Sequence, residues 1–481
     1  MVRDLKLIRR MKMAKNLIYD IHDKPKTSQL LVFAVQQLLA ILAATIAVPA
    51  IVGNGMSASA ALFGAGVGTL VYQLFTKFRS PVFLGSSFAF IGPMQAAFAG
   101  AASMSLGFLG LIIGAVFAGL VYVAIALAVK KFGVKWISKL MPAAVIGPTV
   151  ALIGLSLASA AINDVFSYGP KETFGLNSYF IMSADIWLSF ICAMVTFATV
   201  IICSVYGKKM AKLIPFIIGI VAGYAVALIF TVIGYIAGAD AMKVIDFTPF
   251  KNLLDDGKVV FTTFVDLPQF AFIEGFKGFA DFKWSYLATI AVAYIPVALV
   301  VFAEHIADHK NLSSIIDKDL FENPGLHNTL LGDGVGSMAG AFFGGCPNTT
   351  YGESVGCVAI TKNASIATIT TTAIMSIIIS FFAPFVAFLD SIPGCVMGGV
   401  CITLYGFIAV SGLKMIKAVD LDDNANLFTV SVILITGIGG MAMAIGEIYI
   451  TGIACALVLG IITNLVLNKF KKPSDDNDKS E

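Results

Sequence analysis

Hydrophobic residues recur along this chain in runs of about 20, the length a helix needs to cross a bilayer, and short polar or basic stretches separate the runs. The pattern predicts an all-α polytopic membrane protein with fourteen transmembrane segments. The third and tenth segments are too short or too interrupted for full helices, and each predicts a short extended piece followed by a half-helix. The predicted segments are 29–53, 59–77, 83–100, 106–130, 137–161, 186–206, 213–238, 285–308, 328–345, 348–361, 364–388, 393–413, 425–446 and 448–468.

The tenth segment is interrupted by Pro347 and Gly352 and carries a carboxylate, Glu353, directly after the glycine. Such backbone cannot lie against lipid, because its free N–H and C=O groups would go unpaired. It is tolerated only inside protein or along a cavity, and transporters hold their substrates at interrupted segments of this kind. The third segment is broken in a similar way at Gly85-Ser86-Ser87-Phe88.

An internal repeat accompanies these breaks. The fifth segment opens with P-x-x-V-x-G at 142–147, and the twelfth opens with the same pattern at 393–398. The broken third segment likewise precedes the broken tenth by seven. Repeats of an odd number of segments have opposite orientations in the membrane, so the pattern indicates two inverted repeats of seven, with a site between the broken segments. The alternative is chance, since the motif is short.

Composition and charge agree with a membrane protein. The chain is 58% hydrophobic and 13% charged, with a mean hydropathy of +0.90, whereas soluble proteins are about 25% charged. With the N-terminus inside, the inner loops hold 26 of the 32 Lys and Arg residues. This bias predicts a cytoplasmic arm (1–28), a cytoplasmic tail (469–481) and one long extracellular loop (239–284). The arm has no apolar region typical of a cleaved signal peptide. The seven cysteines lack metal-ligand spacing, so we expect buried free thiols and no metal or cofactor.

Two acidic residues stand in the eighth segment. Glu304 and Asp308 are four residues apart, which places them on one face of a helix, one turn from each other. The ten residues before Glu304 are almost wholly apolar, and a carboxylate at that depth normally marks a substrate or proton path. Two nearby buried carboxylates also favour the protonated form of one of them. The alternative is that 304–309 is already the solvated cytoplasmic end of the helix.

The broken segments add further candidates. Glu353 begins a half-helix, whose N-terminus suits an anion and has free amides that can bind a ligand; the alternative is a simple helix cap. Phe88 and Tyr351 can stack on a flat ring, or they can be ordinary packing residues. Tyr405 places a hydroxyl inside an apolar segment, where it needs a partner if it is buried.

Carboxylates, free amides and aromatic faces together favour a small planar neutral ligand. Its N–H groups would donate to the carboxylates, and its carbonyls would accept from the backbone. No dense ligand set favours a metal, and no Lys or Arg lies within the segments near the site to favour an inorganic anion or an anion exchanger of similar fold. A membrane-embedded enzyme that uses Glu304 and Asp308 as an acid–base pair is a further alternative, but no nucleophile–base arrangement accompanies them.

These motifs resemble the nucleobase–ascorbate transporter (nucleobase:cation symporter-2) family, and within it the bacterial uracil permeases. The family signature, an acid, Gln or Pro followed by N-x-G-x4-T-K/R, reads E-S-V-G-C-V-A-I-T-K from Glu353 to Lys362. Ser354 stands where Asn is usual, and Gln36-Gln37 stands where a Gln-His pair is expected. The resemblance covers nearly the whole chain and is densest in LGSSFAFIGP (84–93), AEHIADH (303–309), NPGLHNTLLGDG (323–334), PNTTYGESVGCVAITK (347–362) and IPGCVMGGVCITLYGFIAVSG (392–412).

The resemblance implies a core domain (29–130 and 285–388), a gate domain (137–238 and 393–468), and antiparallel strands from segments 3 and 10 that meet inside the core. It also implies a role for each site residue. Glu304 and Glu353 would be the uracil-binding acids, Phe88 and Gly352 the amide donors, Tyr351 a ring contact, Tyr405 a gate-domain partner of Glu353, and Glu304 or Asp308 the proton-coupling residue.

The resemblance therefore predicts proton-coupled uracil import by alternating access. A purine (xanthine or urate) permease is the alternative, although relatives that carry purines usually have Gln at the position of Glu353. The family also implies a homodimer that meets through the gate domain. We expect the protein in the cell's inner (plasma) membrane, surrounded by lipid, with no nucleic-acid partner.

Overall fold

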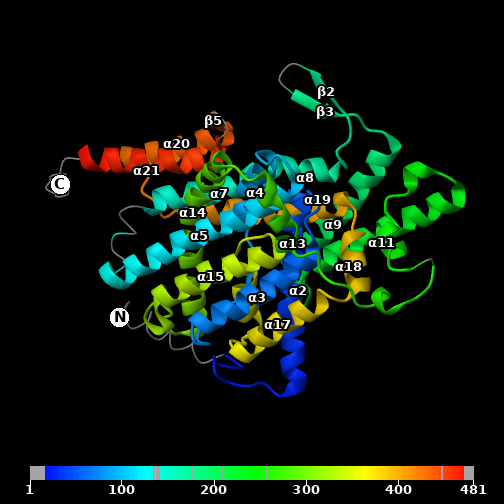
Figure 1. Ribbon diagram of the computed structural model, residues 1–481, viewed down its shortest axis with the longest axis horizontal. Helices are drawn as coiled ribbons and strands as arrows, with labels where there is room; N and C mark the ends of the chain where they lie inside the picture. Colours follow the sequence, from blue (N-terminus) through cyan, green and yellow to red (C-terminus); the bar gives the residue numbers. More distant parts are fainter. Residues whose placement is uncertain are drawn as a thin grey trace.

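The computed structural model describes residues 17–133, 136, 141–174, 177–208, 210–255, 257–445 and 448–470. Within these ranges, nine helices are long and apolar enough to cross a membrane, so the chain is a mostly helical multi-span membrane protein (Figure 1). The nine are α2 (Thr27–Val52), α3 (Ala58–Phe75), α5 (Met104–Phe132), the pair α7 (Ala143–Ser156) and α8 (Ala158–Val165), α9 (Ala184–Tyr206), α11 (Pro215–Ala237), α14 (Trp284–Ile316), α19 (Gly394–Ile416) and α21 (Gly452–Phe470).

The third and tenth predicted segments are interrupted, as the sequence predicts. Each consists of a three-residue strand followed by a short helix, and the two strands pair antiparallel with Gly85 opposite Thr349. We call these two stretches, 84–99 and 348–361, the crossed segments. They comprise β1 (Leu84–Ser86), η1 (Phe88–Phe90) and α4 (Ile91–Ala99) in the first, and β4 (Asn348–Thr350) and α16 (Gly352–Thr361) in the second.

Three predicted segments differ from the helices that the structure contains. The thirteenth segment ends early, because α20 (Asn424–Ile438) gives way to a hairpin of β5 (Met443–Ile445) and β6 (Ile448–Ile450). The glycines around this apolar hairpin stop the helix, but hydrophobicity alone does not mark the change. The eleventh segment divides into α17 (Ile366–Ile379) and α18 (Ala383–Asp390), and α14 continues two turns beyond its predicted end.

The long helices pack into two groups. In the first, α15 (Leu326–Gly344) lies between α3 and α5, while α17 packs on α2 and α3, and α14 packs on α5. Glycines allow the closest approach: a methyl group on Gly64 would lie 2.4 Å from the carbonyl oxygen of Gly340. In the second group, α19 packs along α7, α8 and α9, α11 packs on α9, and α20 packs on α7 and α21.

The two helices that open with the repeated P-x-x-V-x-G motif pack together in the second group, with the two motifs at opposite ends of the pair. Pro142 and Pro393 are the N-cap residues of α7 and α19, so each motif opens a helix. The two helices run antiparallel against each other. A methyl group on Gly154 of α7 would lie 2.4 Å from the carbonyl oxygen of Tyr405, and one on Gly412 would lie 2.1 Å from the amide nitrogen of Ala151. This antiparallel pairing is the arrangement that an inverted repeat predicts.

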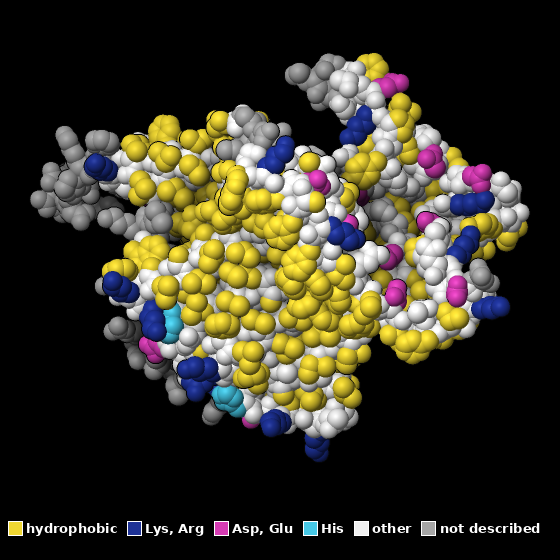
Figure 2. Space-filling view, viewed as in Figure 1, with side chains coloured by type: hydrophobic (Ala, Val, Ile, Leu, Met, Phe, Trp, Pro, Cys, Tyr) yellow, Lys and Arg dark blue, Asp and Glu magenta, His cyan; other side chains and the backbone are white. Residues whose placement is uncertain are grey.

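Apolar side chains cover the middle of the molecular face drawn in Figure 2, while Lys, Arg, Asp and Glu gather at its lower-left and right-hand margins. This distribution suits a protein surrounded by lipid. The loop between α11 and α14 is folded into the short helices α12 (Thr248–Lys251) and α13 (Ala271–Lys277) and three single turns, and α13 packs on α5. The exposed hairpin of β2 (Lys171–Phe174) and β3 (Asn177–Phe180) projects from the helical body at the top right of Figure 1.

Several predicted inner loops lie on one side of the molecule. Tyr19, in the part of the N-terminal arm that the structure describes, forms a β-bridge with Asn363, between α16 and α17. The next residue, Asp20, forms an ion pair of 2.6 Å with Lys318, just beyond α14. These contacts join the arm to two loops that the charge pattern assigns to the same side of the membrane.

Candidate functional site

A cavity of about 460 Å³ lies where the crossed segments meet α14 and the second helix group, within the size range of small-molecule sites. It brings together six of the seven site residues predicted from the sequence. Residues of α9, α10 (Met210–Leu213), α11 and α19 complete its wall, so both helix groups contribute to it. The six predicted residues are Phe88, Glu304, Asp308, Tyr351, Gly352 and Glu353.

The acidic wall of the cavity comes from α14. Glu304 and Asp308 both line it, one turn apart, and the Thr350 hydroxyl of β4 donates to Asp308 Oδ2 over 2.9 Å. The helix continues to Ile316, and His305 between the two acids is fully buried. The helix therefore does not end at 304–309, because α14 continues two turns further, to Ile316.

The crossed segments supply unpaired amides. The first hydrogen bond within α16 runs from the Val355 amide to the Tyr351 carbonyl, so the N–H group of Gly352 has no acceptor in the helix. The same holds for Phe88, because η1 makes its first bond from Phe90. Two helix N-termini thus present free donors at one cavity, an arrangement suited to ligand oxygens.

Tyr351 joins the two crossed segments. Its amide donates to the Phe83 carbonyl over 3.1 Å, and its hydroxyl donates to the Ser86 carbonyl over 2.8 Å. Its ring also fills the space beside Gly85, where a methyl group would lie 2.3 Å from the ring carbons. Tyr351 therefore helps to hold the strand pair as well as lining the cavity.

Tyr405 is the predicted site residue that does not line the cavity. It lies on α19 with 2% of its surface exposed, and its ring meets the Phe88 ring edge-on, with 6.0 Å between ring centres. Among the contacts of the described residues, none joins Tyr405 to Glu353. Its observed contact with the crossed segments is through Phe88.

Three carboxylates, from Glu304, Asp308 and Glu353, face this one cavity. In the described ranges of the chain, no Lys or Arg forms an ion pair with any of them. The cavity therefore has acceptors for ligand N–H groups, and the like charges oppose simultaneous ionisation of all three.

A buried polar cluster behind α14 was missed by sequence reasoning. The side chains of His305 and Asp333 are 0% and 1% exposed, and their Nδ1 and Oδ2 atoms are 2.8 Å apart. His309 stacks on His305, with 4.0 Å between ring centres, and its Nε2 lies 2.7 Å from the Tyr72 hydroxyl. Asp333 follows a glycine in α15, a helix of low hydrophobicity, where one acidic residue is not conspicuous. The signal that could have found it is an acidic side chain inside a predicted transmembrane segment.

Lys212 was also missed. It lies on α10 and is the only Lys or Arg among the described residues that line the cavity. The sequence places it just before the seventh predicted segment, where it reads as one of several inner-loop cations. The prediction that no Lys or Arg lies within the segments near the site did not cover this loop residue, and Lys212 is exposed and, among the described residues, unpaired with the three carboxylates.

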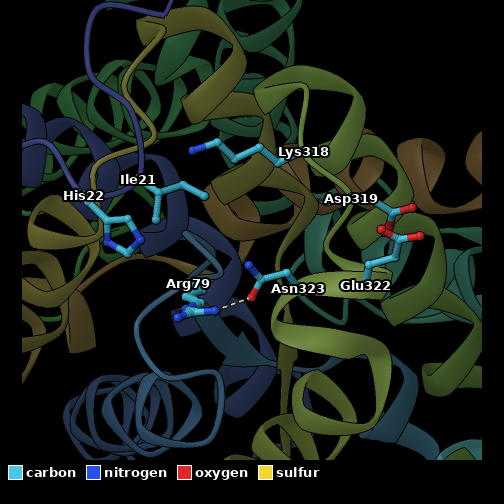
Figure 3. A pocket seen from close by; sticks show the side chains of 7 residues that line it. All are labelled: Ile21, His22, Arg79, Lys318, Asp319, Glu322 and Asn323. Carbon is cyan, nitrogen blue, oxygen red and sulfur yellow. Dashed lines mark hydrogen bonds between the residues drawn. The ribbon is translucent and has the colours of Figure 1, made fainter.

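A second pocket of about 330 Å³ opens on the molecular surface and contains no predicted site residue (Figure 3). The arm contributes Ile21 and His22 to it, and Arg79 donates to Asn323 Oδ1 across it over 2.6 Å. Its cationic and acidic side chains are mixed and exposed. The cavity between the two helix groups, which is lined by the three predicted carboxylates, is the better candidate site.

Known proteins resemble this chain over most of its length. The model of the permease family Xan_ur_permease matches residues 28–446. The chain is 38% identical to the uracil permease of Bacillus caldolyticus, over 94% of each protein. It is 36% identical to the uracil permease of Bacillus subtilis (strain 168), over 96% of this chain and 98% of that protein. It is 33% identical to the uracil permease of Escherichia coli (strain K12), over 93% of each.

Solved structures resemble the fold at low sequence identity. The transmembrane domain of the cyanobacterial bicarbonate transporter BicA superposes with a TM-score of 0.58 at 15% identity, covering 94% of this chain and all of that one. The murine anion transporter Slc26a9 in its inward-facing state superposes with a TM-score of 0.62 at 12% identity, covering 93% of this chain and 69% of that one. At these identities the likeness concerns the fold alone.

Proposed function

This chain belongs to the permease family, a family of transporters and not of enzymes, and we propose that it imports uracil by proton symport. The observation that carries the proposal is the meeting of two glutamates and two free helix N-termini in one cavity. Relatives at 33–38% identity over more than nine-tenths of the chain are named uracil permeases, which supports uracil as the substrate.

In the proposed complex, uracil lies between the crossed segments and α14. Its N–H groups donate to Glu353 and Glu304, and its carbonyls accept from the amides of Phe88 and Gly352. Tyr351 contacts the ring. Each polar edge of uracil then meets the complementary group, which matters because a buried unpaired group costs about 1–3 kcal/mol.

Asp308, together with Glu304, is the proposed proton-coupling group. Both carboxylates line the cavity, no Lys or Arg among the described residues forms an ion pair with them, and the Thr350 hydroxyl links Asp308 to the strand that precedes Gly352 and Glu353. Proton uptake would relieve the repulsion among the three carboxylates when substrate binds. Release of the proton on the inner side would then favour release of uracil.

Alternating access would move the two helix groups against each other. We propose that residues 29–130 and 285–388 form a core domain, and that residues 137–238 and 393–468 form a gate domain. Fourteen segments in two inverted repeats of seven are supported by the matching breaks in 84–99 and 348–361 and by the antiparallel α7–α19 pair. Tyr405 would belong to the gate and approach Glu353 when the domains close.

The proposed orientation places both termini in the cytoplasm of a cell with the protein in its inner membrane. The positive-charge bias and the contacts of the arm with two predicted inner loops support it. We further propose a homodimer that meets through the gate domain, as the family resemblance implies.

Uptake of radiolabelled uracil into proteoliposomes tests the proposal. An inward proton gradient should drive accumulation, and excess unlabelled uracil should abolish the signal, while xanthine and urate should compete weakly. Mass spectrometry should recover uracil chemically unchanged. Strong competition by xanthine or urate would favour the purine-permease alternative, and uptake that is independent of the proton gradient would contradict symport.

A further inference from the structure

Four charged side chains line the cavity among the residues that the structure describes, and the proposed binding of uracil and the proton uses three of them. The fourth, Lys212, lies on α10, the short helix that joins α9 to α11. Lys212 is exposed, and no described carboxylate forms an ion pair with it. The cavity thus contains three carboxylates and one cation that are not paired with one another.

The helix that carries Lys212 packs on the helix that carries Glu353. α10 contacts both α2 and α16, and Leu213 is buried together with Ala40 of α2 and Cys357 of α16. Cys357 follows Glu353 by four residues, so about 6 Å of helix separates them. Lysine has a flexible four-carbon side chain that can cover such a span. The Lys212 ammonium group can therefore approach Glu353 across the cavity that both residues line.

Lys212 and the three carboxylates belong to different halves of the proposed transport machinery. Lys212 lies within 137–238, in the proposed gate domain, and the carboxylates lie within 285–388, in the proposed core domain. Along α19 the cavity extends from Leu404 to Met415, about 16 Å of helix. A motion that closes this space brings the ammonium group and the carboxylates together, whereas the open cavity of this structure leaves them unpaired.

The carboxylates need a partner at one step of the proposed cycle. When uracil is bound, its N–H groups pair with Glu304 and Glu353, and the coupling proton neutralises one acid. After both have left, the empty site must close before it can face outward again. Ionised carboxylates are strongly disfavoured in a closed cavity within the membrane unless they are paired. Protons could neutralise them, but a carrier that returns protonated takes the proton back and loses coupling.

We infer that Lys212 is the counter-ion of the empty carrier. Once uracil and the proton have left, its ammonium group pairs with the cavity carboxylates, Glu353 foremost, and allows the empty site to close and return. When uracil is bound, the ligand occupies the carboxylates, and Lys212 makes no contact with it. The inference rests on the proposed function for the ligand and the transport cycle, and it adds a residue that acts on the return of the carrier rather than on binding.

Two assays with the full chain in proteoliposomes separate the return step from binding. In exchange, vesicles loaded with unlabelled uracil take up radiolabelled uracil without a proton gradient, and the carrier crosses loaded in both directions. In net uptake, vesicles without uracil accumulate it under an inward proton gradient, and every turnover includes the return of the empty carrier. A residue that serves only the empty carrier affects net uptake and spares exchange.

Lys212→Met should lower net uptake at least about tenfold, the smallest loss expected for one hydrogen bond to a charged group. Its exchange rate, and its uracil Kd from calorimetry, should stay within about twofold of wild type, as for an exposed residue outside the binding contacts. Lys212→Gln should behave in the same way. Lys212→Arg keeps the charge on a side chain of different shape and should restore net uptake to within about threefold of wild type.

Lys208→Met is the matched control, because Lys208 is an exposed lysine between α9 and α10 that does not line the cavity. It should match wild type in both assays. Equal losses of net uptake and exchange in Lys212→Met would show that Lys212 also serves the loaded carrier and would overturn the inference. Unchanged net uptake in Lys212→Met would overturn it as well, while the proposed function stands. If wild type neither binds nor exchanges uracil, the proposed function fails, and the counter-ion role fails with it.

Discussion

The two crossed segments share one backbone plan but differ in chemistry. Each has a three-residue strand followed by a helix whose first amides are free, and the strands pair antiparallel inside the protein. In segment 348–361 the helix opens with Gly352 and Glu353, so a carboxylate stands beside the free amides. In segment 84–99 the corresponding residues are Phe88 and Ala89, which bring an aromatic ring and no charge.

This difference shows how two segments with the same backbone plan can form an asymmetric site. The backbone amides come from both segments, because the broken fold supplies them whatever the side chains are. The charged hydrogen-bond acceptors come from only one of the crossed segments, through Glu353, and from the α14 face that carries Glu304 and Asp308. An asymmetric nucleobase, with donors and acceptors on different edges, fits such a division of roles.

The largest expected effect follows from removing the charge that distinguishes the two segments. Glu353→Gln keeps the size of the side chain but loses a charged hydrogen bond to the ligand, worth roughly 1.5–3 kcal/mol, so uracil affinity should fall about 10- to 150-fold. Calorimetry on the folded variant measures the loss. Glu322→Gln, on the surface pocket, is the matched control and should bind like wild type. Affinity of Glu353→Gln within twofold of wild type would remove Glu353 from the site.

The acidic face of α14, which lies opposite the crossed segments, should couple uracil transport to the proton gradient. Asp308→Asn should still bind uracil but lose accumulation driven by the proton gradient. One proton moved across the membrane contributes about 2.3 kcal/mol per 100 mV, equivalent to roughly 50-fold accumulation. Uptake under an imposed gradient, compared with exchange of uracil at equilibrium, separates coupling from binding. Normal accumulation by Asp308→Asn would show that the proton binds elsewhere.

The two crossed segments should also differ in how well each tolerates replacement of a glycine by alanine. On Gly85 it would lie 2.3 Å from the Tyr351 ring, whereas on Gly352 the nearest atom is Asp308 Oδ1 at 3.7 Å. Overpacking costs about 1–3 kcal/mol, so Gly85→Ala should lower the thermal midpoint by several degrees and weaken uracil binding. Gly352→Ala should leave the midpoint unchanged. Equal thermal midpoints for the two variants would show that the strand pair is not held by Tyr351.

The smallest effect on uracil affinity is expected from glycine substitutions in α19, across the cavity from the crossed segments. A methyl group on Gly398 would lie 2.6 Å from the Val165 amide nitrogen, whereas none of the described atoms lies within 4 Å of one on Gly406. If these glycines serve the gate, Gly398→Ala should slow uptake about tenfold, in line with a strained contact of 1–3 kcal/mol, with uracil affinity within threefold of wild type. Gly406→Ala should match wild type in both, and only a larger residue such as Leu should slow it. Equal loss of binding and transport in Gly398→Ala would place this glycine in the pocket instead.

Much of this arrangement could be predicted because lipid restricts the backbone so strongly. Pro347 and Gly352 could not sit in an ordinary spanning helix, so the interruption was visible in the sequence, and the acid beside it was an evident candidate. Glu304 and Asp308 stood out for the same reason, as charges in an apolar run. These features depend on local sequence and on the bilayer, and the structure brings them into one cavity.

Features that depend on tertiary contact were not predictable. The sequence of the β5–β6 hairpin is as apolar as that of the helices beside it. A prediction based on hydrophobicity therefore includes the hairpin in the thirteenth segment. The pairing of His305 with Asp333 depends on how α14 lies against α15. Gln37 and Ser354 stood out only as departures from a family pattern, and their mutual hydrogen bond required both helices to be placed in space.

An experimental structure of the purified protein with uracil bound tests the central claim most directly. We expect uracil between the crossed segments and α14, with its N–H groups on the Glu353 and Glu304 carboxylates and its carbonyls on the Phe88 and Gly352 amides. Uracil bound in the surface pocket beside Arg79, or bound in the cavity without contact to either glutamate, would contradict the account.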